Sequence, residues 1–146
     1  MCNHPDSVFV VIDTDVLVAG VRGSGDANRV LQCCLDGQYR PLMGAALLAE
    51  YEDVMGRPLL WKRSRLSATE REELLDIFLS VCVWTHIYYA WRPNLPDEAD
   101  NHVIELAVAG QAKYVVTRNT RDLWHGELRF PQLRVVTPGE ILKEAS

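Results

Sequence analysis

The pattern of hydrophobic and polar positions along the chain predicts strands that alternate with helices. The clearest strand covers residues 8–12, where five apolar residues lead directly into Asp13, Thr14 and Asp15. A continuous apolar run rich in β-branched residues is typical of a strand that is buried on both faces, as in the centre of a parallel sheet. Further strands are predicted at residues 40–43, 83–89, 114–117 and 134–137.

Apolar residues at helical spacing separate most of these strands. Residues 45–55 show this spacing, and the sequence Ser-Ala-Thr-Glu at 67–70 matches a capping box, the hydrogen-bonded start of a long helix that ends near Val81. Glycines and polar residues at 20–26 indicate a flexible loop. We expect helices at residues 27–37, 45–55, 68–81, 97–109 and 138–145.

Strands that alternate with helices imply a parallel sheet with helices on both of its faces. We therefore predict an α/β protein with three layers, α/β/α, around a central and mostly parallel sheet of about five strands. A chain of 146 residues is long enough to bury one substantial core, and residues 1–146 are expected to form a single domain.

Composition narrows the class of protein only slightly. Apolar residues make up 48% of the chain and charged residues 24%, and no apolar run approaches the roughly 20 residues of a membrane span, so no membrane association is expected. The first residues lack the basic and apolar regions of a signal peptide, which favours a cytoplasmic location. The four cysteines match neither a disulfide framework nor a Cys-x-x-Cys metal site.

Acidic residues follow several predicted elements at points that a parallel sheet would bring together. Open α/β sheets place their chemistry outside the carboxyl ends of the strands. Carboxylates gathered there would repel one another without a cation, and hard oxygen ligands suit Mg²⁺ or Mn²⁺, which activates water for phosphodiester hydrolysis. The candidates are Asp13 after the first strand, Glu50, Asp97, Asp100 and, after residues 114–117, Asp122.

Each candidate also has an ordinary structural interpretation. Asp13 can cap the following helix, and Glu50 can be an exposed helical residue, although its apolar neighbours indicate a largely buried helix. Asp97 is favoured in a first helical turn by the helix dipole. His102 is turned by about 200° from Asp100 around the helix, so we expect His102 to lie on the surface, away from the acidic residues.

Taken in order, these motifs resemble those of the PIN-domain family, compact nucleases that include the VapC-type toxins of toxin–antitoxin pairs. The resemblance implies that Asp13, Glu50 and Asp100 occupy the first three acidic positions of the family, and that Asp122 is the best match to the fourth. The motifs span residues 10–18, 47–51, 97–103, 116–123 and 136–142.

The same resemblance implies a function and partners. The protein would be a Mg²⁺- or Mn²⁺-dependent endoribonuclease that hydrolyses RNA, with Asp13, Glu50, Asp100 and Asp122 around the metal. It would act as the toxin of a toxin–antitoxin pair, form a homodimer, and bind a small antitoxin that inserts a segment into the active-site groove.

Two positions depart from the family pattern. Asp15 stands where many relatives have Asn, which adds a negative charge beside the metal site. Asn119 stands where many relatives have an acidic residue after the fourth strand, and the acid comes only at Asp122. Asn119 and Thr117 are then expected to shape the site, with Asp97 as an accessory residue.

An acidic protein that binds RNA must do so through local groups of basic residues, because the net charge here is −5. Arg118 and Arg121 lie beside Asp122 in the sequence, and Lys62, Arg63 and Arg65 form a second group. Trp61, next to that group, either stacks on RNA or anchors the segment in the core.

Two rival functions remain open from the sequence. The stretch from Asp13 to Val16 also fits the opening motif of haloacid-dehalogenase-like phosphatases, with Lys113 as the lysine which that family requires. A PIN domain that binds nucleic acid or protein without cutting is the other rival, because Asn119 cannot supply charge. Metal-dependent cleavage separates nuclease from binding module.

Overall fold

The structure, a computed structural model, describes residues 8–23, 25–62, 64, 66–86, 101–118 and 133–145. Its centre is a five-stranded sheet in the order β3-β2-β1-β4-β5, and every neighbouring pair of strands is parallel. The predicted α/β fold with a parallel sheet of about five strands is confirmed. The strands are β1 (Val8–Ile12), β2 (Tyr39–Met43), β3 (Val83–Trp84), β4 (Tyr114–Val116) and β5 (Arg134–Val136).

Strand β1 is the middle strand because its side chains are apolar on both faces. Val10, Val11 and Ile12 are fully buried, and Ile12 pairs with Val116 of β4 at the carboxyl end of both strands. Both faces of β1 are therefore covered, as the unbroken apolar run predicts.

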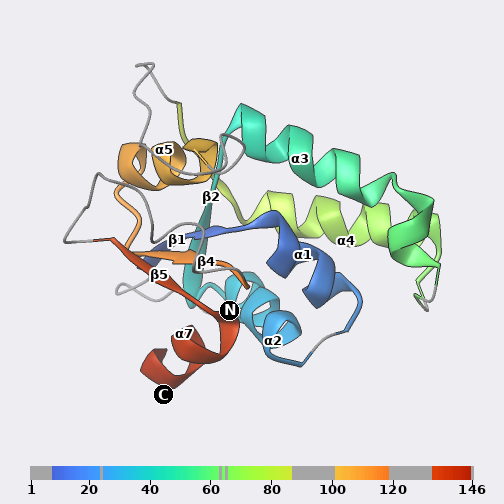
Figure 1. Cartoon of the computed structure of the whole chain (residues 1–146), viewed down its shortest axis with the longest axis horizontal. Helices are drawn as coiled ribbons and strands as arrows, with labels where there is room; N and C mark the ends of the chain where they lie inside the picture. Colours follow the sequence, from blue (N-terminus) through green and yellow to red (C-terminus); the bar gives the residue numbers. More distant parts are fainter. Residues whose placement is uncertain are drawn as a thin grey trace.

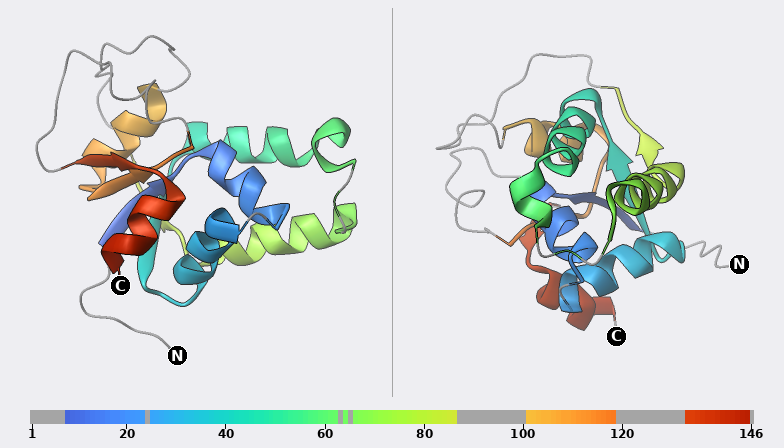
Figure 2. Two further views of the ribbon diagram at one scale, coloured as in Figure 1. Left: turned by 60° about the horizontal axis from the view of Figure 1, so that its bottom comes forward. Right: turned by 90° about the vertical axis from the view of Figure 1, so that its right-hand side faces the viewer.

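Helices cover both faces of the sheet, as Figure 2 shows in its right-hand view. There α3 and α5 lie on one side of the sheet, and α1, α2 and α7 lie on the other. The helices are α1 (Thr14–Val21), α2 (Gly25–Leu35), α3 (Ala45–Met55), α4 (Ala68–Ser80), α5 (Asn101–Ala109) and α7 (Pro138–Ala145), with a short 3-10 helix, η1 (Pro58–Trp61). None of the described helices is both long and apolar enough to cross a bilayer.

Helices α3 and α4 form a hairpin that projects beyond the sheet, with η1 at its tip (Figure 1). The rings of Tyr51 on α3 and Phe78 on α4 lie 6.1 Å apart and tie the two helices together near the sheet. At the start of α4 the predicted capping box is present, because the Ser67 hydroxyl accepts from the Glu70 amide while the Glu70 carboxylate accepts from the Ser67 amide. The hairpin is thus held at its base and at the start of its second helix.

The prediction of a flexible loop at residues 20–26 and of a helix starting near Ala27 is wrong in its bounds. Helix α1 begins at Thr14, directly after Asp13, and Gly20 belongs to it. A Cβ at Gly20 would lie 2.5 Å from Leu31 Cδ1, so this glycine lets α1 and α2 pack closely and does not loosen the chain. Helix α2 already begins at Gly25.

Other predicted boundaries agree with the structure or lie partly outside it. The helix predicted at 45–55 is α3, residue for residue, and the closing helix begins at Pro138 as predicted. Only residues 83 and 84 of the β-prone stretch 83–89 form a strand, and residues 87–89 lie outside the described residues. The start of the helix predicted at 97–109 also lies outside them, and α5 is described from Asn101.

Candidate functional site

The candidate site lies at the carboxyl edge of the sheet, where loops leave β1, β4 and β5 together. The hydrogen-bond ladder continues one residue past the strands at this edge. The Asp13 amide donates to the Val116 carbonyl at 2.9 Å, and the Thr117 amide donates to the Val136 carbonyl at 2.9 Å. The backbones of Asp13 and Thr117 are therefore fixed by the sheet itself.

Asp13 uses both carboxylate oxygens within the protein. Its Oδ1 accepts from the backbone amide of Thr14 at 2.8 Å, as the cap of α1, and its Oδ2 accepts from the Thr117 hydroxyl at 2.8 Å. The capping role predicted for Asp13 is thus present, and its second oxygen binds a residue that follows a different strand. Burial raises the pKa of Asp13 above its ordinary value, a rise that the hydrogen bonds from Thr117 and Thr14 oppose and the nearby Glu50 carboxylate reinforces.

Glu50 reaches the same place from α3. Its Oε1 accepts from the Thr14 hydroxyl at 2.6 Å, and its Oε2 contacts Nε2 of His102 on α5. The hydrogen bond from His102 is the main reason why the pKa of Glu50 lies below its ordinary value. Three helices, α1, α3 and α5, therefore meet at one ionised carboxylate.

The prediction that His102 lies on the surface, away from the acidic residues, is wrong. Its side chain is 18% exposed and its ring nitrogen contacts Glu50. The helical geometry used for that prediction gives the direction of His102 only relative to other residues of α5. The contact arises because α5 packs against α3, a tertiary relation that no spacing within one helix reveals.

Asp15 adds a third carboxylate, one helical step beyond Thr14. Its carboxylate accepts from the backbone amide of Arg118, with the nearer oxygen at 3.1 Å, so it ties the start of α1 to the loop after β4. Burial first, and then repulsion from Asp13, raise the pKa of Asp15 to about 6. Asp15 thus lies close enough to Asp13 for the two carboxylates to repel each other.

Tyr51 explains why Glu50 faces the sheet edge. Its side chain is fully buried, and its hydroxyl donates to the carbonyl of Ile12, the last residue of β1. This hydrogen bond holds α3 against the end of the central strand. The residue before Tyr51 on the helix is then presented to Asp13 and Thr14.

Several predicted site residues fall outside the described part of the chain. Asp13, Glu50 and Thr117 come together, joined by the hydrogen bonds of Thr14 and Thr117. Asp15 lies beside them and accepts from the Arg118 amide, so Arg118 is next to them as well. The remaining candidates, Asp97, Asp100, Asn119, Arg121, Asp122, Arg63 and Arg65, lie outside the described residues.

The described carboxylates fit a hard divalent cation in their chemistry. Asp13, Asp15 and Glu50 offer oxygen donors, and a cation would stabilise the ionised forms of Asp13 and Asp15, which burial disfavours. Within the described part of the chain, no three His, Cys, Asp or Glu side chains lie close enough to hold a metal ion. Two of the four predicted ligands, Asp100 and Asp122, lie outside that part.

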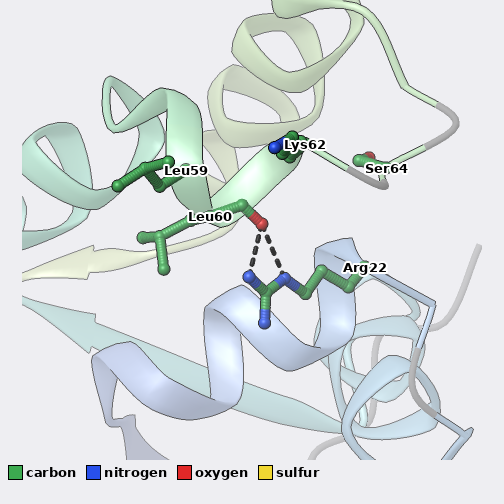
Figure 3. Close-up of a pocket in the computed structure, with 5 residues that line it drawn as sticks. All are labelled: Arg22, Leu59, Leu60, Lys62 and Ser64. Carbon is green, nitrogen blue, oxygen red and sulfur yellow. Dashed lines mark hydrogen bonds between the residues drawn. The ribbon is translucent and has the colours of Figure 1, made fainter.

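Lys62, at the tip of the hairpin, lies at the far end of α1 from Asp13. Helix α1 has eight residues, so its ends are about 12 Å apart. Arg22, the residue after α1, donates from Nε to the Leu60 carbonyl at 2.8 Å, and Figure 3 shows this contact between two of the residues that line a pocket. The pocket is lined by Arg22, Leu59, Leu60, Lys62 and Ser64.

Trp61 at the tip is an anchor and is not available to stack on RNA. It is 5% exposed, its Nε1 donates to the Val54 carbonyl at 2.9 Å, and the guanidinium groups of Arg22 and Arg71 lie 5.9 and 5.1 Å from the ring centroid. Of the two interpretations of Trp61, the core anchor is therefore the one that the structure supports. Lys62, directly after it, is exposed.

The position of Lys113 argues against a phosphatase of the haloacid-dehalogenase type. Lys113 precedes β4 and its amide donates to the Phe9 carbonyl near the start of β1. Asp13 follows β1 at the opposite edge. A lysine that must act beside Asp13 cannot do so from the amino edge of the sheet.

Comparison with known proteins agrees with this arrangement. No curated protein matches the chain in sequence. One solved structure with a similar fold is the "Crystal structure of VapBC2 from Rickettsia felis bound to a DNA fragment from their promoter", with a TM-score of 0.58 and 16% identity over 88% of this chain and 98% of that chain. The sequence model described as "PIN domain" matches residues 9–121, a stretch that includes the carboxylates described above. With most of its length matched and the acidic edge in place, this chain belongs to the PIN-domain family.

Proposed function

We propose that this protein is a Mg²⁺- or Mn²⁺-dependent endoribonuclease and the toxin of a toxin–antitoxin pair. PIN domains are generally nucleases, which supports a hydrolase in broad terms. The observation that carries the proposal is the set of hydrogen bonds joining Asp13, Thr14, Glu50 and Thr117 at the carboxyl edge of the sheet. Such a set holds carboxylates in place before any ligand arrives.

In this proposal the side chains have separate tasks. Asp13, Glu50, Asp100 and Asp122 hold the cation, which when bound supplies positive charge opposite the phosphate and a water of lowered pKa. Thr117 keeps the Asp13 carboxylate aimed at the site through its 2.8 Å hydrogen bond. Thr14 does the same for Glu50, and the Asp15 carboxylate holds the loop that carries Arg118.

RNA and an antitoxin are the proposed partners. Arg118 beside the acidic edge and Lys62 at the hairpin tip offer positive charge at the two ends of α1, where a phosphate backbone could bind. The similar structure is described as VapBC2 with promoter DNA, which supports the proposal that this chain also has an antitoxin partner. We further propose that the protein forms a homodimer. The antitoxin would be small and would insert a segment into the active-site groove.

The test is cleavage of single-stranded RNA by the full chain with Mn²⁺, with and without chelator. We expect Asp13→Asn and Glu50→Gln each to lower the cleavage rate by on the order of 10²- to 10⁴-fold, and chelator to abolish it. Mn²⁺ should also raise the melting temperature of the wild type and do so less for Asp13→Asn. Cleavage that persists in chelator would overturn the proposal.

A binding module is the second candidate, because Asn119 replaces an acid that the family usually has. It predicts tight, salt-sensitive RNA binding with no Mn²⁺-dependent cleavage. The phosphatase alternative would instead give a phosphorylated Asp13 when the protein is incubated with a small phosphate ester.

A further inference from the structure

The carboxylate of Glu50 is held on both sides by residues from two other helices. Thr14, the first residue of α1, donates its hydroxyl to Oε1 at 2.6 Å, and His102 on α5 contacts Oε2 through Nε2. The three residues are distant in sequence, so this group exists only in the folded chain. Glu50 was assigned to the site from the sequence, whereas Thr14 and His102 were not.

Burial decides how much these contacts constrain Glu50. Thr14 is 8% exposed, and the side chains of His102 and Glu50 are 18% and 37% exposed. A half-exposed Glu has several rotatable bonds and would sample many conformers if its carboxylate were unbound. Two donors anchored on different helices restrict it to one direction, toward the end of β1.

A carboxylate that holds a metal or orients water must be fixed in this way. Groups that hydrogen-bond to ligating carboxylates set their orientation, and their loss typically costs about 10- to 100-fold in metal affinity or activity. The direction of the hydrogen bond is clear, because an ionised carboxylate only accepts and Nε2 must therefore be the donor.

We propose that His102 is a positioning residue of the nuclease site, whose Nε2–H holds Glu50 Oε2 and so fixes the Glu50 carboxylate beside Asp13. This inference rests on the function proposed above. With His102 included, α5 itself contributes to the proposed site, next to Asp100, which precedes it in the sequence. A purely structural role for His102 would affect folding but would not act through Glu50.

The experiment measures the apparent Kd for Mn²⁺ from the rise in melting temperature, and the RNA cleavage rate at saturating Mn²⁺. Both are measured on the full chain for the wild type, His102→Leu, His102→Gln, Glu50→Gln and the double variant Glu50→Gln/His102→Leu. The amide nitrogen of Gln can reach the position of the imidazole Nε2 and donate the same hydrogen bond. Melting without Mn²⁺ shows that each variant is folded, and His102→Asn, whose amide is too short to reach Glu50, replaces His102→Leu if that variant does not fold.

We expect His102→Leu to weaken Mn²⁺ binding or slow cleavage by about 10-fold or more, and His102→Gln to stay within about 3-fold of the wild type. In the Glu50→Gln background, His102→Leu should have no further effect, because His102 acts through Glu50. Equal behaviour of His102→Leu and wild type, a failure of Gln to rescue, or additive effects in the double variant would each overturn the inference. A wild type that neither binds Mn²⁺ nor cleaves RNA would overturn the proposed function, and this inference with it.

Discussion

The carboxyl edge of the sheet and the tip of the α3–α4 hairpin lie at the two ends of α1 and are built in opposite ways. At the sheet edge, acidic side chains are held by hydroxyl and amide donors of residues that follow strands directly. At the tip, Arg22 and Trp61 provide the fixed structure, while Leu59, 84% exposed, and Lys62 face solvent.

The two regions therefore suit different tasks: the sheet edge suits metal-dependent chemistry, and the hairpin tip suits binding. Asp13 and Thr117 are placed by the sheet ladder, so their geometry depends on the most buried part of the protein. The tip depends on one aromatic anchor, and residues around that anchor can change without disturbing the sheet. We therefore expect variants at the tip to alter stability or RNA binding while the Mn²⁺ response remains, and variants at the edge to alter the Mn²⁺ response.

The largest effect on stability is expected at the tip, from Trp61→Ala. Removal of a buried Trp that donates a hydrogen bond and contacts two guanidinium groups should lower the free energy of unfolding by about 3 kcal/mol. Urea denaturation measures this loss. Leu59→Ser, in the same 3-10 helix but exposed, is the matched control and should change stability by less than about 0.5 kcal/mol.

If Trp61→Ala kept full stability but lost RNA affinity, the anchor interpretation would be wrong and stacking on RNA would replace it. Folded Trp61→Ala protein should still gain thermal stability from Mn²⁺, because the carboxylates lie at the other end of α1. If Trp61→Ala lost the Mn²⁺ response, the two regions would not be independent of each other.

A smaller effect is expected at the edge, from Asp15→Asn in chelator. The pKa of Asp15 rises from 3.8 in the unfolded chain to about 6, so the folded state loses stability as pH rises between these values. Asn carries no charge and can still accept from the Arg118 amide. After allowance for partial exposure, Asp15→Asn should raise the free energy of unfolding above pH 7 by about 1.5 kcal/mol.

The gain from Asp15→Asn should disappear as pH falls below 3.8, where the carboxyl group becomes protonated in both states. Denaturation curves at pH 3.5, 5 and 7.5 measure this dependence. Asp36→Asn, exposed and before β2 at the opposite edge, serves as the control and should show no such trend. A gain that is constant with pH would exclude charge as its cause.

The smallest effect concerns RNA affinity and the basic residues at 62–65. Replacing Lys62, Arg63 and Arg65 with Ala should flatten the dependence of log affinity on log salt by about 0.7 for each lost phosphate contact on a single strand. The Mn²⁺ response should not change. Lys113→Ala, at the amino edge, is the control; an unchanged slope in the triple variant would place the RNA path elsewhere.

Local signals predicted the elements that carry them. The helix at 45–55 has apolar residues at helical spacing between Gly44 and Gly56, and α4 has its capping box, so both could be located from sequence. The strand at 8–12 and the carboxylates that follow it were predicted for the same reason, because a buried strand and its exit are adjacent in sequence.

What could not be predicted depends on packing between elements. Helix α1 is buried around most of its circumference, so its sequence lacks the polar face that marks a helix, and Gly20 suggested a loop instead of close contact with Leu31. The contact between His102 and Glu50 spans 52 positions and depends on how α5 meets α3. No periodicity within either helix contains that information.

Strand β1 and helix α1 are joined through a single residue, Asp13, and this connection leaves no room for length variation. One residue inserted after Ile12 would turn α1 by about 100° and shift it by about 1.5 Å, which carries the Thr14 hydroxyl away from Glu50. Natural variation and protein engineering can therefore change the side chains around this junction but not its length.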